Sequence, residues 1–234
     1  MRKSLIYFVL SLVILNTACS EDDNEKKAPV VGELSLASPL DSSTCEGVST
    51  SSTKCEVTLN WEPTSENETY VLTVTNLNTN KVVLIQNDIK ETTYKLVLDK
   101  QEPFSWTVSS RDNGTKEISN KSPIWKFYAS AGVSVANYAP FPADLITPIQ
   151  DKVVTAVDGK ILLKWSGSDT DGDNLKYTVY IDKVDGKQTP LTELTNISTT
   201  QASVSVTSGV YYWRVKSSDA NSSSFSQVVS FTVN

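Results

Sequence analysis

The sequence predicts an all-β protein built from two β-sandwich domains in tandem. Three observations indicate this fold: short segments in which apolar and polar residues alternate, an abundance of Ser, Thr, Asn and Val, and a strand-like phrase that occurs twice. Alternation with a period of two is typical of a strand with one face in a core. A chain of 234 residues that is 39% hydrophobic is long enough for about two cores of ordinary size.

The doubled phrase is FSWTVSSRD at 104–112 and YYWRVKSSD at 211–219. A true repeat carries its neighbours with it, and the segments around the two copies also match. The chain therefore contains two copies of one domain, predicted at 34–131 and 145–234. Matching aromatic residues keep nearly constant offsets: Trp61 to Trp165 is 104 residues, Trp106 to Trp213 is 107, and Phe127 to Phe231 is 104.

Alternation assigns an inward face to each matched segment, and all five tryptophans fall on these faces, so we expect them in the cores. Between the copies, the segment 132–144 contains Pro140 and Pro142, which favour an extended, stiffened linker. The predicted inward residues of the first copy are Val57, Leu59, Trp61, Tyr70, Leu72, Val74, Tyr94, Leu96, Leu98, Phe104, Trp106 and Val108. Those of the second are Ile161, Leu163, Trp165, Tyr177, Val179, Ile181, Val204, Val206, Tyr211, Trp213 and Val215.

Three segments resemble fibronectin type III domains. LNWEP at 59–63 is similar to the second strand of that family and the turn after it, while 104–112 and 211–219 resemble its sixth strand. The resemblance covers both copies and implies two tandem fibronectin type III or immunoglobulin-like sandwiches. Phe104 departs from the pattern, because it stands where Tyr211 offers a hydroxyl to a neighbouring turn. No Arg-Gly-Asp loop is present, so the resemblance implies the fold and not the family's adhesive partners.

The N-terminal residues have the layout of a secretory signal. MRKSLIYFVLSLVILNTAC places Arg2 and Lys3 before an apolar run that ends in small residues at Cys19. The alternative is a retained membrane anchor, but that requires about 20 apolar residues. The run here is shorter and is interrupted by Asn16.

The junction at Cys19 resembles that of bacterial lipoproteins, in which the signal is cut before a cysteine that is then lipidated. The acidic segment SEDDNEKK at 20–27 resembles the export signal of surface lipoproteins of the Bacteroides group, and it also suits a solvated tether. The resemblances imply a signal peptide at 1–18 and a lipidated tether at 19–33. They place the protein in the outer membrane, facing the cell exterior.

If Cys19 carries lipid, Cys45 and Cys55 remain as a pair. An even pair of cysteines in an exported chain is most simply a disulfide, and closing so short a loop would add about 3 kcal/mol of stability. A zinc site would need more ligands, and the chain contains no His. We therefore expect a bridge between these two residues.

Charge and composition exclude several classes of function. Two of the 21 basic residues, Arg2 and Lys3, lie in the leader, so the mature chain has 19 basic residues against 27 acidic ones, a formal net charge of −8. Such a surface repels phosphate backbones, so we expect no nucleic-acid partner. The absence of His excludes Ser-His-Asp and Cys-His catalysis, and the carboxylates follow no catalytic pattern, so we expect no enzyme.

The segment SDTDGDNLKY at 168–177 carries Asp169, Asp171 and Asp173 at alternate positions around a glycine. Alternating carboxylates in a tight loop can converge on Ca²⁺, which prefers six to eight oxygen ligands. The spacing does not match an EF-hand loop, so the alternative is a plain turn between the second and third strands. A weak Ca²⁺ site is the one metal that the sequence suggests.

Strand parity also predicts an exposed patch on the second domain. If Tyr211 and Trp213 point inward, Tyr212 and Arg214 point outward, and Tyr180 points outward on the neighbouring strand. Such a patch could stack on a sugar ring or on a protein side chain. The alternative is a cross-strand aromatic pair that stabilises the sheet.

These features predict a lipid-anchored, non-enzymatic outer-surface protein that acts as a binding or accessory module for an extracellular glycan or protein. The alternative is a structural spacer or assembly component that presents stacked domains. An exposed aromatic site on the second domain would favour binding, whereas a uniformly polar surface would favour the spacer.

Overall fold

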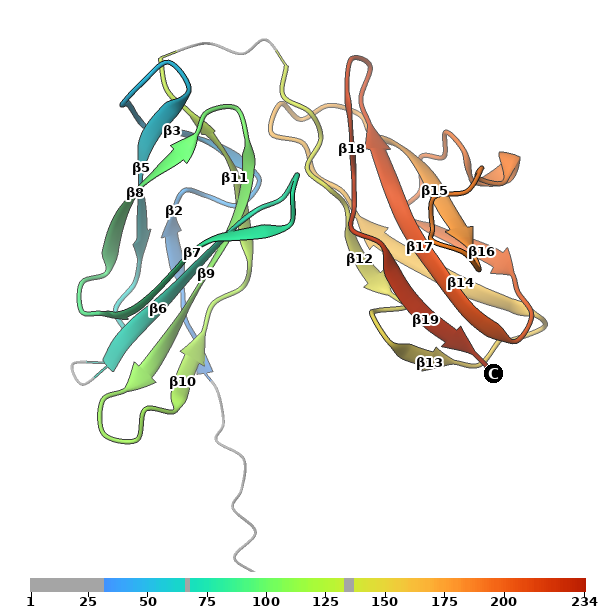
Figure 1. Cartoon of the computed structure of the whole chain (residues 1–234), viewed down its shortest axis with the longest axis horizontal. Helices are drawn as coiled ribbons and strands as arrows, with labels where there is room; N and C mark the ends of the chain where they lie inside the picture. The colour runs from blue at the N-terminus through green and yellow to red at the C-terminus, as the bar shows by residue number, and fades with distance from the viewer. Residues whose placement is uncertain (1–31, 66–67, 133–136) are drawn as a thin grey trace, which may run out of the picture.

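A computed structural model of the chain describes residues 32–65, 68–132 and 137–234. The described residues form two β-sandwiches (Figure 1), one from Gly32 to Ser130 and the other from Asp144 to Val233. Among these residues the one helical element is the short 3-10 turn η1 (Thr192–Leu194). The prediction of an all-β protein with two sandwiches is confirmed.

In the first domain, two sheets face each other across the core. The smaller sheet contains β2 (Leu36–Ser38), β4 (Val48–Ser49), β5 (Lys54–Trp61) and β8 (Thr93–Asp99), with β5 paired to the other three. The larger sheet has the order β7 (Lys81–Ile89), β6 (Glu68–Asn76), β9 (Pro103–Asp112), β11 (Trp125–Ser130) and β3 (Ser43–Glu46). It is extended by β10 (Ile118–Lys121), which pairs with β9, and by β1 (Gly32–Glu33), which pairs with β10.

The second domain repeats this order in a smaller form. One sheet contains β12 (Asp144–Thr147), β14 (Lys160–Ser166) and β16 (Gln201–Ser205). The other has the order β13 (Lys152–Val154), β19 (Val229–Val233), β17 (Gly209–Ser218) and β15 (Lys176–Asp182), with β18 (Ser223–Phe225) beside β17. Both copies also place a cis peptide bond before a proline, Ser38–Pro39 at the end of β2 and Thr147–Pro148 at the end of β12. This shared strand order is that of fibronectin type III and immunoglobulin-like domains.

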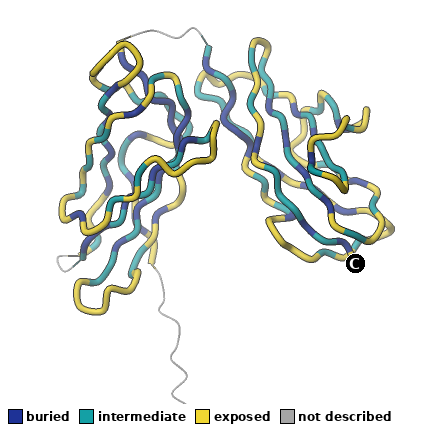
Figure 2. The backbone as a smooth tube through the Cα atoms, viewed as in Figure 1, coloured by how far each residue is buried: buried dark blue, intermediate teal, exposed yellow. Residues whose placement is uncertain are grey.

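Each sandwich has its own core, seen as the buried stretches along the strands in Figure 2. The predicted inward faces are confirmed, although Tyr94, Leu96, Ile181 and Val206 are only partly buried at the margins of the cores. The same edge-to-face aromatic pair recurs in both copies, with an interplanar angle of 69° each time. The pairs are Trp61 with Tyr70, at 5.5 Å between ring centroids, and Trp165 with Tyr177, at 5.6 Å.

The described part of the segment between the copies is packed and is not a free-standing spacer. Tyr138 and Phe141 are buried against Tyr128 of β11, with ring centroids 4.7 and 5.0 Å from that of Tyr128. The Tyr128 hydroxyl donates a hydrogen bond to the carbonyl of Ala139. The two prolines of this segment are buried as well, so their stiffness serves a close contact between the domains.

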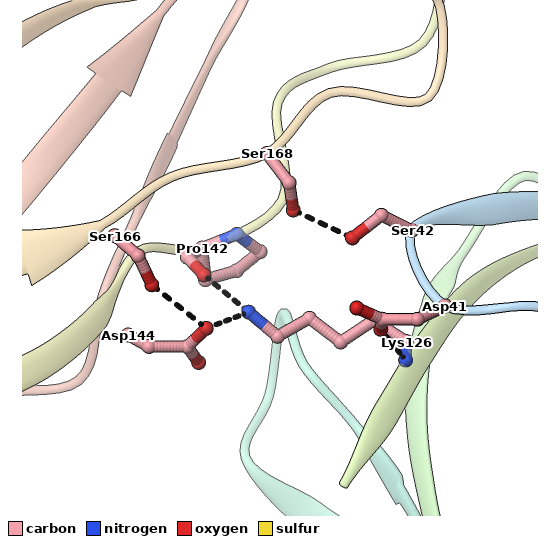
Figure 3. A network of polar contacts seen from close by, with 7 residues as sticks. All are labelled: Asp41, Ser42, Lys126, Pro142, Asp144, Ser166 and Ser168. Atoms are coloured by element: carbon pink, nitrogen blue, oxygen red, sulfur yellow. Dashed lines mark hydrogen bonds and ion pairs between the residues drawn. The ribbon is translucent and has the colours of Figure 1, made fainter.

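A polar seam joins the two domains beside this cluster (Figure 3). The ammonium group of Lys126, on β11, lies 2.5 Å from a carboxylate oxygen of Asp144 at the start of β12. Two pairs of hydroxyls also meet across the seam at alternate residues. Ser42 donates to Ser168 over 2.9 Å, and Thr44 lies 3.1 Å from Thr170. The seam therefore joins the two domains through contacts that form only when both domains are present.

We expect Asp144→Ala to destabilise the protein measurably. The Lys126 side chain is only 9% exposed, so removing its partner leaves a buried ammonium group without its counter-charge. The expected cost is about 1–3 kcal/mol in the free energy of unfolding, the range for one orphaned buried polar group. Denaturant unfolding of the variant measures it.

A matched control is Glu56→Ala, which breaks the pair between Lys95 and Glu56 on the surface of the first domain. Both partners of that pair are substantially exposed, so we expect a loss of about 0.5 kcal/mol or less. Equal effects of the two substitutions would show that the seam contributes no more than a surface ion pair.

Candidate functional site

The outer face of β15 and β17 carries the predicted patch. Tyr211, Trp213 and Val215 are buried, so the residues between them on β17 must face away from the core. Tyr212 and Arg214 are half-buried on that outer side. Tyr180 of β15 lies directly opposite Arg214 in the antiparallel ladder, so the structure places two of the three predicted residues side by side.

Arg214 packs against two aromatic rings that also contact each other. Its guanidinium carbon is 4.9 Å from the ring centroid of Tyr180 and 4.2 Å from that of Phe225, and the two centroids are 5.8 Å apart. A guanidinium over an aromatic face is attracted by the ring quadrupole and loses side-chain freedom. The three side chains therefore form one stack, which we call the Arg214 stack.

Sequence reasoning missed Phe225. This residue lies on β18 opposite Lys216 of β17, and its side chain is 39% exposed. It follows the doubled phrase, in a Ser-rich stretch where alternation is hard to read. The one sequence signal that could have identified Phe225 is an aromatic residue within this otherwise polar stretch.

Tyr212 lies apart from the stack. Its neighbours across the sheet are Asp182 on β15 and Ser230 on β19. Among the described residues, the aromatic contact of this face joins Tyr180 to Phe225, and Tyr212 takes no part in it. The three predicted residues therefore share the outer face, and Phe225 joins Tyr180 and Arg214 in the stack.

The first domain has no such stack at the matching position. Trp106 corresponds to Trp213, so Thr107 occupies the place of Arg214, and its partner across the ladder is Thr73. The two copies have similar cores and differ on this outer face. Any ligand that recognises the Arg214 stack binds the second copy alone.

The structure does not bring the three aspartates together as a calcium site. Asp169 accepts a hydrogen bond from the backbone N–H of Asp171 within the loop, whereas the Asp171 carboxylate accepts one from the N–H of Tyr138, 2.6 Å away. Across residues 32–65, 68–132 and 137–234, no three acidic or cysteine side chains are grouped so that they could hold a metal ion. Gly172 has a φ of +78°, as the turn interpretation of the loop requires.

This loop instead belongs to the seam between the domains. Ser168 and Thr170 contact the first domain, and Asp171 holds the backbone of Tyr138 in the packed segment. Burial raises the pKa of the Asp169 carboxyl above its ordinary value. The Asp-rich loop thus has a positioning role for which no metal is needed.

The predicted disulfide is wrong: the thiols of Cys45 and Cys55 are both free. Cys55 is fully buried in the first core from β5, and Cys45 packs against the same core from β3 in the opposite sheet. Burial raises the pKa of Cys45 to about 11, with a further contribution from the nearby Cys55 thiol. The even number of cysteines did not predict a disulfide correctly, because both thiols pack against the apolar core as small hydrophobic side chains.

We expect a thiol titration of the Cys19→Ser chain, unfolded without reductant, to find both remaining cysteines free. In the folded protein the reaction should be slow at about pH 7, because Cys55 is buried and Cys45 stays protonated well below its raised pKa. The rate should rise as the pH approaches 11. If the unfolded chain shows no titratable thiol, Cys45 and Cys55 form a disulfide after all.

Cys19 lies outside the described residues, as do the signal and most of the acidic tether. Within the described ranges, no helix has the length and apolar character to cross a membrane.

No family model matches the chain, and no curated protein matches it. Among solved structures, the chain is similar to the fibronectin(III)-like modules of CbhA from Clostridium thermocellum, with 13% identity and a TM-score of 0.31 over 86% of this chain and 92% of that one. It is also similar to a two-domain fibronectin type III segment of chicken tenascin, with 15% identity and a TM-score of 0.27 over 86% and 97%. A third is the FN1–FN3 region of chicken CNTN1, with 14% identity and a TM-score of 0.30 over 86% and 65%. The fold assignment rests on the strand order of the chain itself.

Proposed function

We propose that this protein is a non-enzymatic binding or accessory module, anchored by lipid at Cys19 to the outer face of the outer membrane, that binds an extracellular glycan through the second domain. The observation that carries the proposal is the Arg214 stack, an aromatic and cationic surface held on a rigid sheet. A non-enzymatic role agrees with the fold, because such sandwiches commonly serve as binding modules or spacers.

The stack suits a sugar because it presents flat rings on an open face. Phe225 is 39% exposed, and Tyr180 beside it is half-buried with its ring near that of Phe225. One outward neighbour of Tyr180 on β15 is the small residue Thr178, and Phe225 stays partly exposed, so the rings are not enclosed. A pyranose ring can lie on such a surface and bury its apolar face.

The placement of the first described residues agrees with an N-terminal anchor. Strand β1 lies at the end of the first domain that is remote from the junction with the second domain (Figure 1). A tether that enters there leaves the Arg214 stack and the seam unobstructed. The lipid itself is proposed from the residues around Cys19.

A second candidate function is a structural spacer, and the seam between the domains favours it. The ion pair of Lys126 with Asp144 joins the two domains, and the aromatic cluster around Phe141 holds the segment between them against the first domain. A rigid pair of domains is useful for holding another component at a set position. The two functions differ in whether the Arg214 stack contacts a ligand.

Glycan-array binding by the Cys19→Ser mature chain tests the binding function. Tyr180→Ala and Phe225→Ala should each weaken binding by about 1 kcal/mol or more with little change in thermal stability, as is typical of exposed anchors. Leu162→Ala is the control, because Leu162 is 44% exposed on the opposite sheet of the same domain. Tyr212→Ala should have a smaller effect than either stack variant. If the chain binds no glycan and these variants only lower the melting temperature, the binding function is contradicted and the structural spacer remains.

The anchor is tested separately. The wild-type protein should carry lipid on Cys19 by mass spectrometry and should be digested when intact cells are treated with protease. Cys19→Ser should abolish lipidation and release the protein from the membrane fraction. Full protection from protease in intact cells would contradict the outward orientation, and an unmodified wild-type Cys19 would contradict the anchor.

A further inference from the structure

The outer face around the Arg214 stack carries positive charge that has no ion-pair partner among the residues the structure describes. Among the described residues, the ion pairs of the chain involve Lys54, Lys95 and Lys126, and neither Arg214 nor Lys216. The Nε atom of Arg214 is buried and has no hydrogen-bond acceptor among these residues. Lys216 lies two residues further along β17 on the same face, 5.9 Å from the centroid of Phe225.

The nearby acidic group on this face is already used. Asp182, at the end of β15, accepts backbone hydrogen bonds from Val184, Asp185, Gly186 and Gln188 in its own turn. Its carboxylate therefore closes the turn and is not directed at Arg214. In a chain with a formal net charge of −6, two neighbouring cations that form no ion pair within the described ranges are a local exception.

The packing of Arg214 against the two rings preorganises its guanidinium group to bind an anion. Its guanidinium packs against two rings, which restricts the side chain, so less conformational freedom is lost on binding. A guanidinium presents several N–H donors in a fixed fork that matches a carboxylate, and partial removal from water strengthens the pairing. Lys216 adds a second positive charge about 7 Å along the strand, within reach of the same ligand or of its next unit.

We propose that this face binds the carboxylate groups of an acidic polysaccharide, that is, a glycan built from uronic acids. Arg214 binds a carboxylate, Lys216 adds long-range attraction, and Tyr180 and Phe225 contact the sugar rings. The inference rests on the proposed binding function and names its ligand class. Charge complementarity favours the acidic glycan over a neutral one, and the exposed rings beside the cation favour a sugar over an acidic peptide.

The test uses the Cys19→Ser mature chain and three acidic probes, polygalacturonate, alginate and hyaluronan, with isothermal titration calorimetry as the readout. Fully methyl-esterified polygalacturonate is the matched neutral probe, because it has the same sugar backbone without the charge. Polyglutamate supplies carboxylates without sugar rings. We expect at least one acidic glycan to bind about tenfold or more tightly than the ester and polyglutamate, with affinity falling between about 20 mM and 300 mM NaCl.

Two charge variants and one control localise the site. Arg214→Gln should weaken acidic-glycan binding by about tenfold or more, and Lys216→Gln by a smaller factor. Lys164→Gln removes an exposed cation from β14 on the opposite sheet and should leave affinity unchanged. Phe225→Ala provides an independent probe of the same site if Arg214→Gln fails to fold, which a melting curve shows.

The outcomes separate this inference from the function on which it rests. Equal affinity for the acidic and esterified polymers, or an unchanged affinity in Arg214→Gln, would overturn the anion site and leave glycan binding in place. Polyglutamate bound as tightly as the best polysaccharide would assign the face to acidic peptides instead. Failure of all three acidic polymers, with a neutral glycan bound on the array, would again overturn only this inference. Failure of every glycan would overturn the binding function as well.

Discussion

Trp106 and Trp213 lie at the centres of β9 and β17, and both side chains are almost wholly excluded from solvent. Because side chains alternate along a strand, burial of one such residue determines the direction of every other residue on that strand. If the pairing register of the strand shifted by one residue, the large indole and the apolar residues two positions before and after it would all face solvent. The cost of that exposure keeps each register fixed, and the outer faces of both domains follow from it.

The repeat shows how one core can support two different surfaces. Inward positions in the two copies carry similar apolar residues, including the pairs of Trp61 with Tyr70 and Trp165 with Tyr177. Outward positions are constrained by packing much less and have diverged, so Thr107 in one copy corresponds to Arg214 in the other. The specific chemistry of the protein therefore lies on the faces that the core leaves free.

The features that the sequence predicted well are those set by local alternation. Strand positions, inward residues and the outward direction of Tyr180 and Arg214 all depend on a period of two, which can be read within a few residues. Phe225 could not be assigned to the stack, because its contact with Arg214 depends on how β18 pairs with β17. The disulfide prediction was wrong for a related reason, since residue type and spacing do not reveal which partner a side chain meets in three dimensions. The same limit left the Asp-rich loop open between a turn and a calcium site. Asp171 shows this clearly, because its partner is a backbone N–H of the segment between the domains.

The seam has a consequence for how such domains can be joined into longer assemblies. Phe127 of the first copy corresponds to Phe231 of the second, so the positions of Lys126 and Tyr128 are taken in the second copy by Ser230 and Thr232. Ser230 has no ammonium group to pair with an aspartate, and Thr232 has no ring to receive the aromatic residues of a following segment. A further domain joined after the second copy would therefore not find at these positions the ion pair and the aromatic contacts that fasten the second domain to the first.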